Sequence, residues 1–405
     1  MSVLRDILVP VTLLKDPDHF GGTRDGDCLR GDLVLGGRQI AMLRAAAPSD
    51  TPRMMVPALI EAHCHLDKCH TISRLGAVGG DLRAAIDAQL ADKTNWTEAD
   101  LRQRMTKGLS ELQQSGCQAV RSHVDWGDTP APPTGWSVLN ELAGDFPTLL
   151  LQTAALTGID KLADADFCNS MARGIAKRGN GILGGFILDH DEADIRNGLK
   201  NAFAAAEKYG LALDFHVDEG LGNYNGLEAI CDMAIALKFE GPILCGHAVS
   251  LMDRDADALK RIIDKLLRAR IFVCALPTTN LYLQGRQQGT PDRRGITRLR
   301  ELHAAGVPIV VGSDNVADAF CPMGQHDPRT ALHLAALGAH LDPPMGDWLP
   351  AITTNAARAL GLDDACIENT KPEHLRLCAA ATTADLAAAR HPLQRLPQLK
   401  DKAYS

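Results

Sequence analysis

The sequence lacks the clusters of Lys and Arg that bind nucleic acid or anionic membrane surfaces. Its 42 Lys and Arg residues are outnumbered by 50 Asp and Glu residues, which gives a formal net charge of -8. We therefore expect no nucleic acid and no membrane as a partner. With 405 residues, of which 45% are hydrophobic, the chain is long enough for a large core, and a small molecule is the expected partner.

The sequence also lacks a disulfide pattern. Its eleven cysteines are odd in number and scattered, and no two of them form a C-x-x-C pair, which indicates reduced, buried thiols. No apolar run approaches the roughly 18 residues of a membrane span. The start, M-S-V-L-R-D-I-L-V, has neither a basic segment before its apolar part nor a small-residue cleavage site. We expect a cytoplasmic, unprocessed protein.

Eight short, apolar runs rich in β-forming residues recur from residue 56 onward. They cover residues 56–63, 117–126, 148–158, 181–189, 211–219, 242–250, 271–280 and 308–315. Segments with helical periodicity separate them, such as 99–116, 194–210 and 255–269. Most runs begin about 30 residues apart, which is the length of one strand-helix unit. The spacing predicts an α/β fold, a (β/α)8 barrel of the TIM type over residues 56–365.

The two ends of the chain do not fit this repeat. The first 55 residues contain short β-rich segments with Gly turns, and one similar run, 374–380, lies near the end. We expect residues 1–55 and 366–405 to form a small β-sandwich-like domain beside the barrel. The long gap after the first strand predicts an inserted loop or helix within 70–98 over the barrel mouth. Trp96 and Trp126 either line this mouth or pack in the core.

Polar side chains end several of the predicted strands, and these ends meet around one axis in a barrel. His63 and His65 alternate at the end of the first strand, so both imidazoles point to the same face. His216 and Asp314 end the fifth and eighth strands. Three imidazoles and a carboxylate suit one divalent metal ion, Zn²⁺ or Fe²⁺. This set is therefore predicted to be a metal site.

Three further residues stand near the same ends. Glu219 follows His216 by three residues, where a carboxylate outside the metal ligands has the position of a proton shuttle, although a lone Glu here is also typical of a surface loop. His247 ends the sixth strand. For His123, in the second strand, a hydrogen-bonded core position and a contact to the substrate or behind the metal both stay open.

Seven segments, in this order, resemble the amidohydrolase superfamily and, within it, the cytosine deaminase group. They are H-C-H-L-D-K (63–68), R-S-H-V-D (121–125), D-F-H-V-D-E-G (214–220), G-H-A-V-S-L (246–251), N-L-Y-L-Q-G-R (280–286), R-R-G-I-T-R (293–298) and G-S-D-N-V-A-D-A-F-C-P-M-G (312–324). The resemblance covers roughly residues 55 to 365. The fifth and sixth segments are not metal motifs, so they indicate the subgroup.

The resemblance implies a metal-dependent hydrolase that releases ammonia from an amino-substituted N-heterocycle. It implies that His247 hydrogen-bonds the attacking water or the tetrahedral centre and that Asp314 accepts the water proton. Glu219 would pass protons to the ring nitrogen and to the departing ammonia. The fourth strand offers no Lys to be carboxylated, so one metal ion is expected rather than two.

The sequence departs from the cytosine-specific members at the substrate side. They carry a Gln just after the third strand, where this chain has Thr157, and often a second Asp where it has Asn315. Phe320 keeps an apolar stacking surface. We expect a substrate other than cytosine, such as a pterin, an isoguanine-like purine or a triazine. The predicted substrate contacts are Asp67, Lys68, His123, Thr157, Gln284, Asn315 and Phe320.

Two other functions stay open at this point. The same metal and water can cleave a cyclic amide or an alkylamino C–N bond, and a barrel can also hold a metal without catalysis. Members of the family often form oligomers, so a homo-oligomer is a further state to test.

Overall fold

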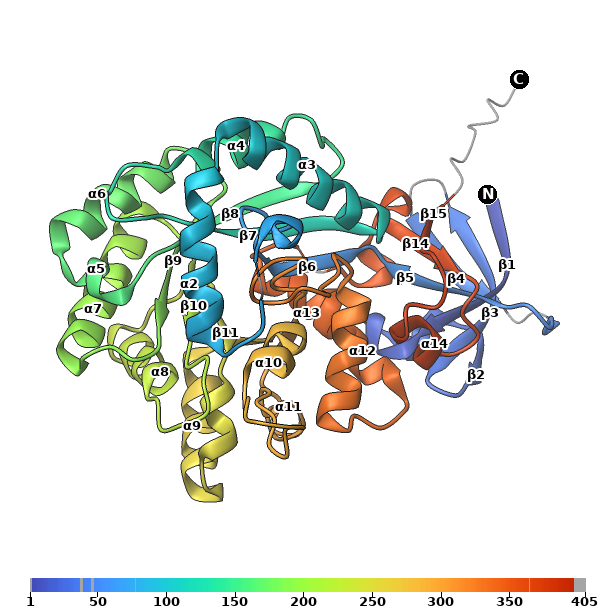
Figure 1. Cartoon of the computed structure of the whole chain (residues 1–405). Helices are drawn as coiled ribbons and strands as arrows, with labels where there is room; N and C mark the ends of the chain where they lie inside the picture. The colour runs from blue at the N-terminus through green and yellow to red at the C-terminus, as the bar shows by residue number, and fades with distance from the viewer. Residues whose placement is uncertain (1, 37–38, 45–46, 77, 364, 397–405) are drawn as a thin grey trace.

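The barrel is built from eight parallel strands that follow one another in chain order (Figure 1). The computed structural model describes residues 2–36, 39–44, 47–76, 78–363 and 365–396. The barrel strands are β6 (Leu59–Cys64), β7 (Cys117–Asp125), β8 (Leu150–Leu156), β9 (Gly181–Ile187), β10 (Leu213–Val217), β11 (Ile243–His247), β12 (Phe272–Ala275) and β13 (Ile309–Val311). Each of them overlaps one of the eight predicted runs, so the predicted fold class is confirmed.

The first and last barrel strands meet at their carboxyl ends. Cys64 forms a parallel bridge with Asp314, and the amide of Asp314 donates to the carbonyl oxygen of His63 at 2.9 Å. This contact brings the end of β6 next to the segment that follows β13. Residues that lie about 250 positions apart in the chain therefore share one side of the barrel mouth.

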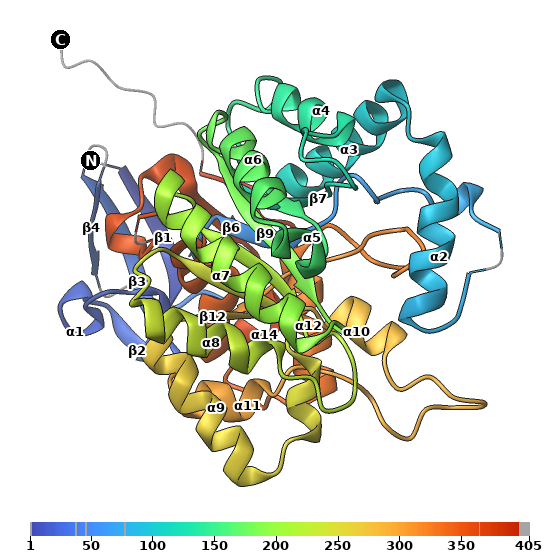
Figure 2. The same cartoon turned by 90° about the vertical axis from the view of Figure 1, so that its left-hand side faces the viewer.

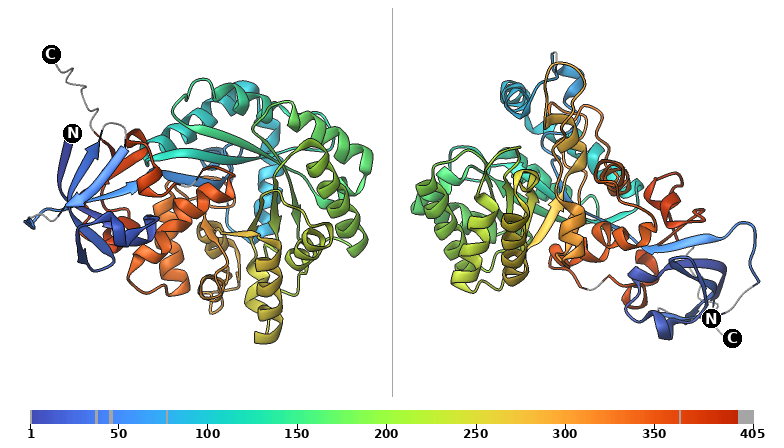
Figure 3. Two further views of the ribbon diagram at one scale, coloured as in Figure 1. Left: turned by 180° about the vertical axis from the view of Figure 1, so that it is seen from behind. Right: turned by 90° about the horizontal axis from the view of Figure 1, so that it is seen from below.

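Helices cover the outside of the barrel, as Figure 3 shows from behind and from below. They are α3 (Glu98–Gln114), α4 (Thr134–Leu142), α5 (Ile159–Ala163), α6 (Ala165–Ala176), α7 (Glu192–Tyr209), α8 (Gly226–Leu237), α9 (Ala256–Ala269), α10 (Pro277–Leu283), α11 (Leu299–Ala304), α12 (Pro328–Ala339) and α13 (Thr354–Ala359). In α9, Leu259, Ile262, Ile263 and Leu266 are buried, which is the spacing of one apolar helix face. Asp255 caps its first turn by accepting from the Ala258 amide.

The two ends of the chain meet in one seven-stranded sheet beside the barrel. Its strands are β1 (Ser2–Pro10), β2 (Thr23–Asp25), β3 (Cys28–Gly36), β4 (Gln39–Arg44), β5 (Arg53–Pro57), β14 (Leu375–Cys378) and β15 (Gln394–Arg395), with helices α1 (Pro17–Phe20) and α14 (Thr383–Ala387) nearby. Antiparallel pairing of β14 with β5 joins the two ends, as expected. Many buried apolar side chains of this sheet and of the barrel belong to one continuous cluster, and a second, smaller cluster includes Ile60, Leu244 and Val310 of the barrel strands. The domain division at residues 55 and 366 stays a prediction.

The predicted insertion contains helix α2 (Leu82–Asp92), which stands apart from the helices around the barrel (Figure 2). Asp92 at its end accepts hydrogen bonds from Arg74 at 2.8 Å and from the indole of Trp96 at 2.8 Å. Trp126 is 2% exposed and packs edge-on against Trp136, so the core alternative holds for it. The contacts of Asp92 with Arg74 and Trp96 join the two ends of the insertion.

The cysteine side chains and the helices bear on the expectations drawn from composition. Ten of the eleven cysteines are buried thiols. Within the described ranges, we find no helix with both the length and the apolar character needed to cross a membrane. The cytoplasmic location stays a prediction.

Candidate active site

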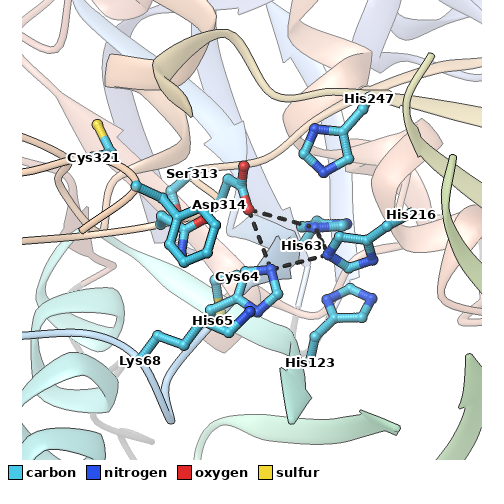
Figure 4. Close-up of polar contacts among 12 residues, drawn as sticks. His63, Cys64, His65, Lys68, His123, His216, His247, Ser313, Asp314 and Cys321 are labelled. Carbon is cyan, nitrogen blue, oxygen red and sulfur yellow. Dashed lines mark hydrogen bonds and ion pairs between the residues drawn. The ribbon is translucent and has the colours of Figure 1, made fainter. Parts of the chain in front are cut away.

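Three imidazole nitrogens converge at the mouth of the barrel. The Nε2 atom of His216 lies 3.1 Å from Nε2 of His63 and 3.0 Å from Nε2 of His65. Asp314 Oδ1 lies 3.6 Å from His63 Nε2 and 3.3 Å from His65 Nε2. Figure 4 shows these side chains turned toward one another. The four residues that were predicted to be metal ligands are therefore brought together.

The polar atoms of this group fit a cation. Asp314 is 1% exposed, and neither of its carboxylate oxygens has a hydrogen-bond partner among the described residues. A buried carboxylate without donors is costly unless a positive charge balances it. Burial lowers the pKa of His63, His65 and His216 well below the usual value, so these imidazoles are neutral and can offer lone pairs. The donor set suits Zn²⁺ or Fe²⁺.

Backbone conformation helps to aim two of the residues. Asp314 has a φ of 58° and His247 a φ of 69°, both in the left-handed region that residues other than Gly rarely adopt. Figure 4 shows both side chains turned toward the imidazoles of His63 and His216.

His123 lies directly behind the converging imidazoles. Its ring centroid is 4.1 Å from that of His63, and the side chain is fully buried. Its Nε2 atom is 3.1 Å from Asp214, whose other oxygen accepts a hydrogen bond from Arg121 at 2.8 Å. His123 is close enough to join the metal group, but the Asp214 carboxylate already faces its Nε2 atom. Asp314, without such a partner, is the better fourth ligand.

Glu219 and His247 form a pair at the edge of the site. Glu219 Oε2 lies 3.5 Å from His247 Nε2, while Glu219 Oε1 is buried without a partner among the described residues. Burial raises the pKa of Glu219 well above its usual value, and repulsion from Asp314 adds to this. Burial lowers the pKa of His247 to about 4. Glu219 can thus be protonated, and His247 is neutral.

Asn280 fixes the proton of His247. Its side-chain amide Nδ2, which only donates, lies 3.0 Å from His247 Nδ1. The neutral imidazole must therefore accept at Nδ1 and carry its proton on Nε2, the atom that faces Glu219. Asn280 lies in the N-L-Y-L-Q-G-R segment, which sequence analysis linked to the subgroup without giving Asn280 a role.

A cavity of about 380 Å³ opens beside these residues, within the range of roughly 300–1,000 Å³ that is usual for small-molecule sites. Larger cavities of about 520 and 780 Å³ lie elsewhere on the surface, lined by none of the converging residues. The 380 Å³ cavity is lined by His216, Glu219, Lys68, Thr157, Phe320 and Phe186, and by residues of α2 that include Ile86 and Gln89. Helix α2 of the insertion therefore forms part of the cavity wall.

Lys68 reaches this cavity as a buried cation. Its ammonium is 3.1 Å from Asp125 and 5.1 Å from the ring centroid of Phe320. Burial alone would lower the pKa of Lys68, but Asp125 and Asp67 more than offset this and raise it. Asp67 does not line the cavity; it is buried and accepts from the Asp125 amide at 2.9 Å. Asp67 thus supports the partner of Lys68.

The remaining predicted substrate contacts lie at different depths. Thr157 is 4% exposed and lines the cavity. Gln284 donates to the carbonyl oxygen of Glu219 at 2.9 Å, and Asn315 donates to Asp318 at 2.7 Å. Neither Gln284 nor Asn315 is on the cavity wall, so the structure gives both of them positions that support the loops around the site.

Sequence reasoning missed several buried carboxylates beneath the site. Glu61 accepts from the amide of His63 at 3.0 Å and from that of Ser313 at 3.2 Å, so it holds the ends of β6 and β13 together. Asp218 accepts from the amides of Gly226 and Leu227 beyond β10. Glu61 and Asp214 each stand two residues before a predicted His ligand, so strand alternation places them on the same face and was the available signal.

Comparison with known proteins identifies the family. The profile of the Amidohydrolase family matches residues 76–369. The pterin deaminase of Rhizobium rhizogenes (strain K84 / ATCC BAA-868) is 34% identical over 374 residues, which cover 89% of this chain and 84% of that relative. The chain belongs to the amidohydrolase family. The resemblance predicted from the sequence motifs is confirmed.

Two solved structures share the fold of this amidohydrolase. One is 5-methylcytosine deaminase from Klebsiella pneumoniae liganded with 5-fluorocytosine, with a TM-score of 0.80 and 23% identity over 97% of this chain and 94% of that chain. The other is N-isopropylammelide isopropylaminohydrolase from Burkholderia multivorans ATCC 17616, with a TM-score of 0.73 and 21% identity over 97% and 96%. At these identities the comparison shows a shared fold. It covers 97% of this chain, which includes both the barrel and the terminal sheet.

Proposed function

We propose that this amidohydrolase is a hydrolytic deaminase of amino-substituted N-heterocycles and that its substrates are pterins. One observation carries the chemistry: the Glu219 carboxyl, whose Oε1 has no partner among the described residues, lies on the wall of the same cavity as His216, beside a cluster with the ligands of one divalent ion. The 34% identity to a pterin deaminase over most of both chains supports the substrate class.

His63, His65, His216 and Asp314 would hold the ion, Zn²⁺ or Fe²⁺. When bound, a divalent cation acts as a Lewis acid that lowers the pKa of water toward neutrality. The converging Nε2 atoms and the unpartnered carboxylate of Asp314 support this assignment. No second ligand set with a carboxylated Lys is needed.

The residues of the chain supply the proton transfers. Water adds to the ring carbon that bears the amino group, and Asp314 takes one water proton. Protonated Glu219 donates its proton to the adjacent ring nitrogen. The water proton held by Asp314 then restores Glu219. Glu219 then relays the second water proton to the amino group, the C–N bond breaks, ammonia leaves, and a ring carbonyl remains. His247 donates from Nε2 to the oxygen on the tetrahedral carbon.

The cavity favours a ring larger than cytosine. Thr157 is small, which leaves room beside Gly158 at the place where cytosine-specific enzymes carry Gln. Phe320 offers an aromatic face 5.1 Å from the Lys68 ammonium, and a ring lying on Phe320 can direct an exocyclic oxygen to this cation. An oxo-substituted bicycle such as a pterin satisfies both features.

To test the proposal, metal-loaded enzyme is incubated separately with pterin, isoguanine, cytosine and an aminotriazine, and the ammonia released is measured. We expect turnover of pterin above that of the other three, and roughly a hundred- to ten-thousandfold slower turnover with the Glu219→Gln variant as matched control. A panel without any ammonia, together with ring opening of a cyclic amide or loss of an alkylamine, would establish the alternative C–N hydrolysis. If no product forms from any of these compounds, the result supports the alternative of a barrel that holds a metal without catalysis.

A further inference from the structure

A second group of metal-ligand side chains lies outside the active site. The Nε2 atom of His70 and the Nδ1 atom of His326 approach the same oxygen, Oε2 of Glu111, at 3.0 and 2.8 Å. The side chain of His326 is fully buried, that of His70 is 11% exposed and that of Glu111 is 34% exposed. Solvent therefore reaches the cluster from the side of Glu111. None of the proposed catalytic steps uses these residues.

We propose that His70, Glu111 and His326 form a second divalent-cation site, which takes an ion of the Zn²⁺ class. Two imidazoles and one carboxylate are a common three-ligand set for Zn²⁺, with the fourth position open to water. The three ligand atoms lie within 4.8 Å of one another. One ion can contact all three when His70 Nε2 and His326 Nδ1 carry lone pairs and no protons, the state that a metal requires of imidazole ligands.

The surroundings of the cluster leave room for an ion at His326 Nδ1 and Glu111 Oε2. His326 Nε2 has no hydrogen-bond partner among the described residues, so no contact there opposes a shift of the imidazole proton from Nδ1 to Nε2, which frees the Nδ1 lone pair. Gly108 makes room for this imidazole, because a Cβ there would lie 3.0 Å from His326 Cε1. Lys107 is 62% exposed and approaches the other Glu111 oxygen, Oε1, at 3.9 Å, which leaves Oε2 to an ion.

The position of the cluster indicates what a bound ion does. Glu111 lies on α3, His70 follows β6, and His326 lies between β13 and α12. The His70 amide donates to the carbonyl oxygen of Val316 at 3.1 Å, so the two loops already touch. These loops carry Lys68 and Phe320 of the cavity wall. An ion at this site would join both loops to α3 and stabilise the folded enzyme.

The experiment starts from enzyme that holds one equivalent of Zn²⁺ in the active site. Zn²⁺ is then titrated by calorimetry without substrate, and Co²⁺ by its visible absorption. We expect a second equivalent in the wild type, accompanied by a rise in the thermal unfolding midpoint. Glu111→Gln and His70→Asn should lose only this second equivalent and keep the first. Asn is chosen because His70 has a φ of 60°, which Asn tolerates.

Lys107→Gln is the matched control, because it removes a neighbouring positive charge and leaves all three ligands. We expect it to bind the second equivalent about two- to fivefold more tightly than the wild type. The proposal is overturned if wild-type enzyme holding one ion binds no second equivalent. It is equally overturned if folded Glu111→Gln binds the second ion as the wild type does. Since no substrate is present, neither result depends on the proposed deaminase activity.

Discussion

The amide of Asp314 donates to the carbonyl oxygen of His63 at 2.9 Å, so the contact that closes the barrel joins two of the proposed metal ligands. Glu61 reinforces the same junction by accepting from the amides of His63 and Ser313. Barrel closure and alignment of the ligands therefore depend on the same few backbone contacts, and damage to this junction should affect stability and metal binding together.

Gly312 offers a direct test of this junction. A Cβ at Gly312 would lie 2.8 Å from the His63 carbonyl oxygen and 3.0 Å from Glu61 Oε1. We expect Gly312→Ala to lower the free energy of unfolding by ~1–3 kcal/mol, because the packed neighbours must move, and to weaken metal binding. Gly76→Ala is the control, since nothing lies within 4 Å of a Cβ there. Denaturant unfolding and metal content measure both effects; an unchanged metal affinity in Gly312→Ala would contradict the coupling.

Replacement of Glu219 should separate catalysis from metal binding. We expect Glu219→Gln to lower kcat by roughly a hundred- to ten-thousandfold, the usual contribution of a positioned proton donor, with the metal content unchanged. Because burial raises the pKa of Glu219 and the protonated form donates, wild-type activity should fall as pH rises through that pKa. The residual activity of Glu219→Gln should lack this decline. A variant with normal kcat would rule out the role proposed for Glu219.

Asn280 is predicted to act through His247. Removal of its amide in Asn280→Ala leaves the proton of His247 free to occupy Nδ1, so kcat should fall by about ten- to a hundredfold at constant metal content. Thr279→Val is the control, because the neighbouring Thr279 hydroxyl is also buried but has no partner to lose. Steady-state kinetics and metal analysis of both variants decide the matter. Equal losses in the two variants would point to packing instead of proton placement.

Asp318 should make stability depend on pH. Burial raises its pKa from 3.8 to about 7, although its oxygens accept from Asn315 and from the amides of Phe320 and Cys321. The folded protein therefore binds a proton that the unfolded chain releases, and the contribution of Asp318 to stability falls as pH rises between these two values. We expect Asp318→Asn to flatten this part of the pH dependence of the unfolding midpoint. Parallel curves for both proteins would contradict the assignment.

The sequence predicted the barrel because its signals are local and repeated. Each barrel strand is an apolar run between helical segments, and the period of about 30 residues is the length of one strand-helix unit. The alternation of His63 and His65 and the strand-end positions of His216 and Asp314 predicted that these four side chains meet at one end of the barrel. Their convergence, with Nε2 atoms about 3 Å apart, needs only the closure of the barrel.

The substrate side was harder to predict, because its contacts depend on loop geometry. Sequence reasoning grouped Asp67 with Lys68, yet only Lys68 reaches the cavity, and Asp67 supports Asp125 from behind. Gln284 and Asn315 likewise bond to the loops of Glu219 and Asp318. His70, Glu111 and His326 are also distant from one another in the chain, so no local sequence pattern indicates their cluster.

The identity of the reaction is tested most directly with isotope-labelled water. Metal-loaded enzyme is incubated with pterin in H₂¹⁸O, and the product is examined by mass spectrometry while ammonia is assayed. We predict one ammonia released for each product and one ¹⁸O atom in its new ring carbonyl. A product that keeps all of its nitrogen and has gained a whole water molecule by ring opening would contradict deamination.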